Sequence, residues 1–150
     1  MDERDKRNIR KGYLKIHISV NVRSKKILSL KVTTDEHVHD GKALPELVDD
    51  TIKSDRKTTV CRLFADGAYD SNDVFRYLSE NGILPCIKVR KNARIKIKTN
   101  HILRNLSVLA QRNGLQGWND SVSYGRRWTG RNRVLLNKEN VWRACLFCQV

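Results

Sequence analysis

The sequence predicts an α/β fold, a mixed sheet flanked by helices, and three observations support this prediction. Apolar and polar residues alternate at a period of two over residues 12–22, which is typical of a half-buried strand. Apolar residues recur at helical spacing over 42–53, 72–81 and 102–111. Short apolar runs at 60–65 and 83–89 lie between these segments and favour strands. The order is therefore a hairpin, then helix, strand, helix, strand and helix.

The hairpin comes first in this order. A turn at 23–26 separates the alternating segment 12–22 from a second apolar segment at 27–32, so the two strands are predicted to pair antiparallel. His17 falls on the polar side of the first strand, and we interpret it as an ordinary surface histidine.

The next two helices are marked by their ends. The helix at 42–53 carries Pro45 near its start, where proline is tolerated, and the helix at 72–81 is followed by Gly82 as a stop signal. Before the first of them, a loop contains His37 and His39 beside acidic residues. This pattern raises the alternative of a metal site, but Mg²⁺ prefers carboxylates and nothing nearby supports zinc.

The strand at 60–65 runs directly into an acidic turn that contains Asp66, Gly67 and Asp70. A carboxylate at the end of a buried strand is fixed in position, so Asp66 is a candidate catalytic residue and metal ligand. The alternative is that Asp66 and Asp70 only cap the helix that begins near Ser71.

The strand at 83–89 leads into residues 90–98, a segment that we interpret as a ribbon or loop that contacts phosphates. Its basic residues are Arg90, Lys91, Arg94, Lys96 and Lys98. In the helix predicted after it, the apolar positions are Ile102, Leu103, Leu106, Leu109 and Ala110. Residues 117–119 are then expected to interrupt regular structure.

The net charge of +14 is concentrated in the second half of the chain. Residues 1–75 hold 15 Lys and Arg against 13 Asp and Glu, whereas residues 76–150 hold 15 against 3. A surface with so few compensating acids favours a polyanionic partner, nucleic acid first, through phosphate contacts and counterion release.

The composition also limits the location of the protein. No segment approaches the ~20 apolar residues of a membrane span, and no apolar region follows the charged residues 2–7 as in a signal peptide. We therefore expect no membrane association and a cytoplasmic, nucleoid-associated protein. A lone C-x-x-C at Cys145 and Cys148 has no second half, so it does not by itself favour zinc.

Several segments together resemble a known family: KGYLKIHISV, HDGK, ADGAYDS, PCIKVRKNA and YGRRW. In this order and spacing they resemble the insertion-sequence transposases of the DDE class, which have a ribonuclease-H-like catalytic core. The resemblance covers about residues 8–128. It implies DNA binding and metal-dependent strand cleavage and transfer, with DNA and a transposase multimer as partners.

The resemblance implies three carboxylates that hold two Mg²⁺ or Mn²⁺ ions, and Asp66 matches the second of them. The first is expected on a strand that precedes residues 12–22, in an Asp-Ser-Thr-Gly-like context. Residues 1–11 lack this context, and Asp2 and Asp5 do not match it. We therefore expect a domain that is truncated at its N-terminus.

The third carboxylate belongs to a pattern of Tyr, two residues, Arg, three residues and Glu. Tyr124 and Arg127 match its start, but position 131 is Arg. Back-translation of the residues after Trp128 and reading one nucleotide later permits the family's helix, with Glu opposite Arg131. We therefore divide the chain into a partial catalytic domain at 1–128 and an aberrant tail at 129–150, shifted in frame, whose apolar residues are expected to be exposed or loosely packed.

These considerations predict a transposase fragment that is catalytically inactive as it stands, because it holds one of three carboxylates. The alternatives are a basic DNA-binding module or regulator of an intact transposase and, less favoured because it needs the same carboxylates, a ribonuclease-H-type nuclease. Asp66 is the expected catalytic and metal-binding residue, and Tyr124 and Trp128 support the motif. The expected DNA-binding residues are Arg90, Lys91, Arg94, Lys96, Lys98, Arg126 and Arg127.

Overall fold

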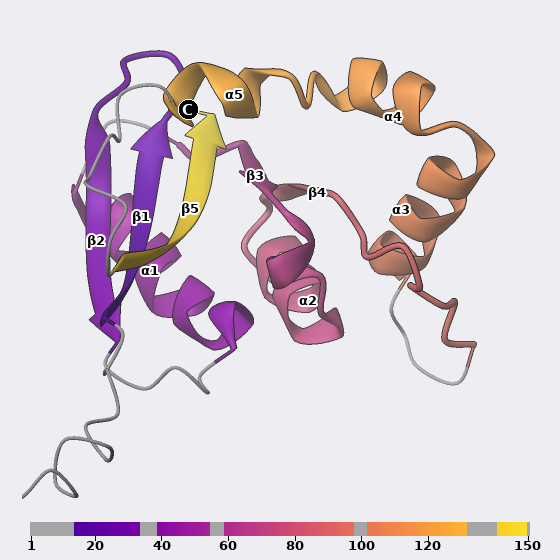
Figure 1. Cartoon of the computed structure of the whole chain (residues 1–150), viewed down its shortest axis with the longest axis horizontal. Coiled ribbons are helices and arrows are strands. Elements are labelled where there is room, and N and C mark those ends of the chain that lie inside the picture. The colour runs from indigo at the N-terminus through magenta and orange to yellow at the C-terminus, as the bar shows by residue number, and fades with distance from the viewer. Residues whose placement is uncertain (1–13, 34–38, 55–58, 98–101, 132–140, 150) are drawn as a thin grey trace, which may run out of the picture.

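A five-stranded mixed sheet forms the centre of the protein, with the strand order β2-β1-β5-β3-β4 (Figure 1). The computed structural model describes residues 14–33, 39–54, 59–97, 102–131 and 141–149, with Leu14, residues 129–131 and the last segment described by their backbone alone. The strands are β1 (Leu14–Asn21), β2 (Ile27–Thr33), β3 (Arg62–Ala65), β4 (Leu84–Ile87) and β5 (Val141–Gln149). The predicted mixed α/β class is confirmed.

The sheet contains two pairs of strands, and the single strand β5 joins them. β1 and β2 form the predicted antiparallel hairpin, and β3 and β4 pair in parallel. β5 lies between the two pairs, parallel to β1 over eight residues and antiparallel to β3 over three. Residues 141–149, which were predicted to belong to a loosely packed tail, therefore form a central strand by their backbone.

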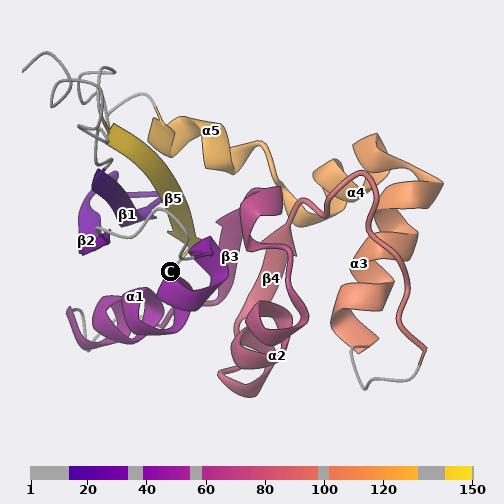
Figure 2. The same ribbon diagram turned by 60° about the horizontal axis from the view of Figure 1, so that its bottom comes forward.

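Helices cover both faces of this sheet. They are α1 (Asp40–Ser54), α2 (Asn72–Glu80), α3 (Ile102–Asn113), α4 (Leu115–Val122) and α5 (Arg126–Arg131), with a short 3₁₀ helix η2 (Gly67–Tyr69) after β3. Figure 2 shows α1 and α2 on one side of the sheet and α4 and α5 on the other. No helix in the described ranges is long and apolar enough to cross a membrane.

Side chains alternate between the two faces along β3, as the pleat of a strand requires. Leu63 and Ala65 are buried in the core beneath α1 and α2, whereas Phe64 packs on the opposite face with Trp118 and Tyr124. β3 is therefore buried on both sides, which explains why its sequence is a continuous apolar run.

The interpretation of His17 as a surface residue is wrong. Its side chain is fully buried, because α1 covers the face of β1 on which it lies. Its two ring nitrogens lie 3.5 Å from the Tyr69 hydroxyl and 3.3 Å from the Thr33 hydroxyl. Burial lowers the pKa of His17, so its neutral form is favoured.

The same face of β1 also makes a polar contact with α1. Ser19 is buried and accepts a hydrogen bond from the hydroxyl of Thr51 at 2.8 Å. The polar positions of the alternating sequence thus face a helix rather than water. The strand is buried on both faces, and hydrogen bonds satisfy its inward polar groups.

The predicted helices at 42–53, 72–81 and 102–111 are confirmed as α1, α2 and α3, with small differences at the ends. Gly82 follows α2 with a φ of 68°, a left-handed conformation that suits glycine. The break expected at residues 117–119 is wrong, because these residues lie inside α4, where Trp118 packs into the core. Packing of that side chain outweighs the low helix propensity of Gly117.

The apolar positions that predicted α3 differ in burial, and Leu103 is the one that packs against the core. Ile102, Leu106 and Leu109 are exposed to 64%, 54% and 42%, whereas Arg104 and Val108 are the buried residues of this helix. Arg104 faces the interior, because it has a partner there in Asp70.

Candidate functional site

Asp66 lies where the sequence predicted it, immediately after β3, and caps η2. One carboxylate oxygen accepts a hydrogen bond from the backbone N–H of Ala68 at 3.1 Å. The other accepts one from the guanidinium of Arg127 at 2.9 Å, and 44% of the Asp66 side chain is exposed. Capping is therefore part of the role of Asp66, as the alternative proposed, although the helix that it caps is η2 rather than α2.

Arg127 reaches Asp66 from α5, 61 residues further along the chain. Its guanidinium lies 5.4 Å from the ring centre of Trp128 and 6.0 Å from that of Tyr124. Stacking on aromatic rings restricts the guanidinium and keeps it directed at the carboxylate.

Tyr124 fixes the start of α5 against β3. Its hydroxyl donates a hydrogen bond to the carbonyl oxygen of Ala65 at 2.8 Å, and its ring lies 5.2 Å from that of Trp118. Burial raises the pKa of Tyr124, so the hydroxyl keeps its proton. The two motif residues Tyr124 and Arg127 are thus brought to the same strand end as Asp66.

The described residues supply one carboxylate at this place. β5, the strand beside β3, contains no Asp or Glu, and no cluster of three metal-ligating side chains occurs among the described residues. Mg²⁺ needs about six oxygen ligands and is usually held through one or two carboxylates and phosphates. One oxygen of Asp66 is also paired with Arg127, so the described residues do not by themselves fit a centre for two metal ions.

The alternative metal site at the histidine loop stays a prediction, because residues 34–38 lie outside the described part of the chain. His39 is exposed, and His37 lies outside the described residues.

Asp70, four residues after Asp66, differs from it because it is buried and has a structural role. Its side chain is completely buried, and Arg104 contacts both of its oxygens, at 2.7 and 3.2 Å. The backbone N–H of Arg90 donates a third hydrogen bond to it at 3.0 Å. The prediction that Asp70 caps α2 is wrong, because Ser71 is the cap and accepts a hydrogen bond from the N–H of Val74.

The predicted basic segment is confirmed as a loop, and side chains of α3 hold it in place. Arg104 and Arg112 donate to the carbonyl oxygens of Arg94 and Ala93 at 3.1 and 2.6 Å. Gln111 bonds the backbone on both sides of Lys88, at the Ile87 carbonyl oxygen and the Val89 N–H. The loop is therefore fixed although it contains no regular secondary structure.

The predicted DNA-binding side chains that are described lie at the surface, except for Arg127. Arg90, Lys91, Arg94, Lys96 and Arg126 are exposed, whereas Lys98 lies outside the described residues. The Nε atom of Arg90 donates to the Gly67 carbonyl oxygen at 3.0 Å, so the loop contacts the turn that follows Asp66. The structure thus brings Arg90, Arg127 and Asp66 together at the carboxyl end of β3. We call this region the Asp66 edge of the sheet.

The prediction from sequence missed Arg104, Asn105, Gln111 and Arg112 as supports of this edge. Arg104 and Val108 share a helix face because they are four residues apart, so the spacing contained a weak signal for a buried arginine. This signal was missed because the prediction followed the apolar residues of α3, most of which are exposed.

Comparison with known proteins gives one match to a protein family. The family model described as Transposase DDE domain matches residues 3–143, and this range continues beyond Trp128. No curated protein and no solved structure shows a significant match to the chain.

The buried pair of Asp70 and Arg104 gives a stability prediction. Arg104→Ala leaves a buried carboxylate without its counter-charge, and we expect the free energy of unfolding to fall by about 3–5 kcal/mol. Urea unfolding monitored by tryptophan fluorescence measures the change.

Arg112→Ala is the matched control, because it removes an exposed arginine of the same helix that has a single hydrogen bond to the loop. Its expected cost is about 1 kcal/mol. Equal losses for the two variants would show that the buried pair has no special importance.

Proposed function

Because the chain belongs to the family of transposases with a DDE domain, we propose that its role in transposition is to bind DNA at the Asp66 edge of the sheet without cleaving it. The family supplies the link to transposition and to DNA. The contacts of the basic loop support the proposal that the chain binds DNA. The contacts of Asp66 support the proposal that it does not cleave DNA.

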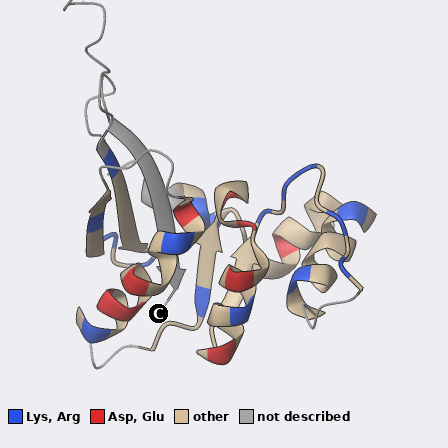
Figure 3. Cartoon of the chain, turned by 90° about the horizontal axis from the view of Figure 1, so that it is seen from below, with Lys and Arg blue, Asp and Glu red and all other residues tan. Residues whose placement is uncertain are grey.

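The basic loop between β4 and α3 carries the proposal of DNA binding. Figure 3 shows its Lys and Arg positions in blue along one end of the molecule, away from the acidic positions of α1. Arg90, Lys91, Arg94 and Lys96 are exposed there, and α3 fixes the backbone beneath them. Because the backbone is already fixed, binding to phosphates orders only the side chains of these cations, which lowers the entropic cost.

Arg126 adds an exposed cation from α5, and Arg127 joins α5 to Asp66. DNA that contacts the loop and α5 together would pass over the strand end between them. Lys98 follows the described part of the loop in sequence and adds to its charge.

The fold is proposed to be ribonuclease-H-like, with Asp66 as the remaining member of its carboxylate set. The mixed sheet with helices on both faces and the position of Asp66 at the end of β3 support this proposal. With one carboxylate, and that one paired with Arg127, we propose no strand cleavage or transfer by residues 1–150. A DNA-binding chain of this kind could act as a regulator of an intact transposase.

The loss of the third carboxylate is proposed to result from a change of reading frame after Trp128. Tyr124 and Arg127, which match the start of the motif, contact Ala65 and Asp66, whereas position 131 in α5 is Arg. The nucleotide sequence of the gene tests this directly. We expect the next frame to encode Glu opposite Arg131, and any other codon there would overturn the proposal.

We expect the purified chain to bind double-stranded DNA with an affinity that falls steeply as salt rises. Each phosphate contact contributes about −0.9 to the slope of log K against log salt, so several contacts give at least about a tenfold loss between 50 and 200 mM. Fluorescence anisotropy of labelled duplexes measures it. Affinity that does not change with salt, or no binding at low salt, would contradict the proposed function.

We expect no metal-dependent nicking of supercoiled plasmid DNA by this chain in Mg²⁺ or Mn²⁺. Asp66→Asn is the matched control, since it removes the single matching carboxylate while keeping the shape of the side chain. Gel electrophoresis should show the two proteins at the same background. Nicking by the unchanged chain that Asp66→Asn abolishes would show that the site is active.

A further inference from the structure

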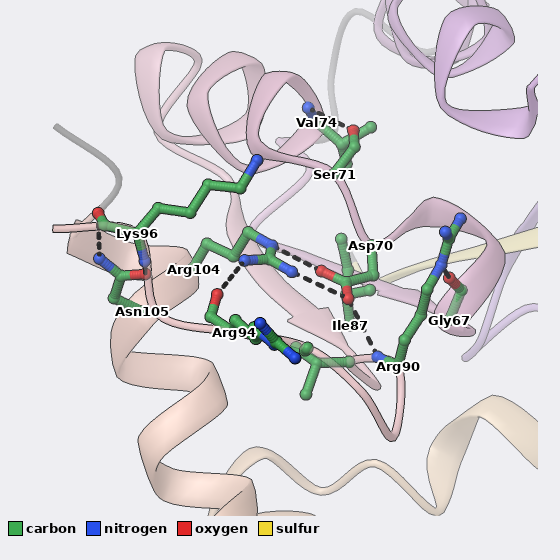
Figure 4. Close-up of polar contacts among 12 residues, drawn as sticks. Gly67, Asp70, Ser71, Val74, Ile87, Arg90, Arg94, Lys96, Arg104 and Asn105 are labelled. Atoms are coloured by element: carbon green, nitrogen blue, oxygen red, sulfur yellow. Dashed lines mark hydrogen bonds and ion pairs between the residues drawn. The ribbon is translucent and has the colours of Figure 1, made fainter. Parts of the chain in front are cut away.

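A polar hollow of about 570 Å³ lies beside the turn that follows Asp66. It is bounded by the start of α2, by the loop after β4 and by α3 (Figure 4). Its size is within the ~300–1,000 Å³ of ordinary ligand pockets, but its lining is mostly charged rather than apolar. The basic residues that line it are Arg76, Arg90, Arg94, Lys96 and Arg104.

The two acidic residues of the lining are already paired within the protein. Asp70 is bound by Arg104 and by the backbone N–H of Arg90, and Asp73 forms an ion pair with Arg76 at 2.7 Å. Arg90, Arg94 and Lys96 therefore give the hollow a net positive charge. Such a charge favours an anionic ligand.

Side chains of α3 form hydrogen bonds with the backbone of Arg94 and Lys96, the cations at the rim. Arg104 donates to the carbonyl oxygen of Arg94, and the side chain of Asn105 bonds both the N–H and the carbonyl oxygen of Lys96, at 3.2 and 3.3 Å. Figure 4 shows these contacts together with the pair of Arg104 and Asp70. The backbone positions of Arg94 and Lys96 are thus set before any ligand arrives, which reduces the entropic cost of binding.

Arg90 connects the hollow to the Asp66 edge. Its Nε atom donates to the carbonyl oxygen of Gly67, the residue after Asp66. A ligand that reaches from Arg94 past Arg90 therefore arrives at the turn of Asp66. A chain of linked anions, such as a nucleic acid backbone, fits this arrangement better than a single small anion.

We propose that this hollow binds one phosphodiester group of a DNA strand, held by Arg94 and Lys96, so that the next part of the strand passes Arg90 toward Asp66. Arginine offers two parallel N–H donors to a phosphate, and lysine adds a point charge. This inference rests on the proposed function, because it assigns one specific phosphate contact within the proposed DNA surface. Asp70, Arg104 and Asn105 are positioning residues of this contact.

The test compares two double variants of equal charge. Arg94→Gln with Lys96→Gln removes the cations of the rim, while the backbone groups that bond Arg104 and Asn105 remain. Arg23→Gln with Lys26→Gln is the control, because both residues are exposed in the turn between β1 and β2. The register of β1, β5 and β3 places that turn at the end of the sheet opposite Asp66.

We expect the rim variant to bind labelled duplex DNA at least about tenfold more weakly and to reduce the salt slope by about 1–2, one for each lost phosphate contact. The control variant should change the affinity by less than about threefold, the effect of its altered net charge. Equal losses in the two variants would overturn the inference and leave the proposed function intact. Failure of the unchanged chain to bind DNA would instead overturn the proposed function.

A second measurement separates a DNA phosphate from a free one. Inorganic phosphate and a nucleoside monophosphate are added as competitors at the same ionic strength as a chloride control. We expect no displacement of DNA beyond the chloride effect, because the strand makes several contacts at once. Complete displacement by millimolar inorganic phosphate would identify a small-anion site and overturn the inference.

Discussion

The buried ion pair between Asp70 and Arg104 is the constraint on which the Asp66 edge of the sheet depends. A carboxylate that is completely buried is stable only with a partner, and Arg104 supplies this partner from α3. The same guanidinium bonds the carbonyl oxygen of Arg94. One interaction therefore joins the turn after β3, the basic loop and α3, and it adds to the pairing of β3 with β4 that brings the start of the loop beside Asp66.

A second constraint acts on the other side of Asp66 and brings α5 to the strand end. Tyr124 bonds the last residue of β3, and Arg127 then reaches the carboxylate of Asp66. The edge is thus fixed from both sides by contacts over long sequence separations. β5 connects the hairpin with β3 and β4, and it brings no carboxylate next to Asp66, because residues 141–149 contain no Asp or Glu.

The parts of the fold that depend on local patterns could be predicted from the sequence. The hairpin follows from a period of two, and α1 and α2 follow from helical spacing. Gly82 marks the end of α2, and its positive φ agrees with this. The polar face of β1 could not be predicted, because alternation does not show whether water or α1 covers it, and His17 is buried as a result. The orientation of α3 was missed for a similar reason: its buried face is defined by an arginine whose partner lies 34 residues earlier.

The sequence by itself determined that this is an α/β protein with an acidic strand end and a basic second half, because strand alternation, helical spacing and charge are properties of neighbouring residues. Tertiary structure decided which charged residues are used in the interior and which remain at the surface. Asp66 and Asp70 are four residues apart in the same acidic turn, yet one is half-exposed and the other completely buried. The difference arises from Arg127 and Arg104, which reach the turn from helices distant in sequence, and no local pattern specifies contacts over such separations.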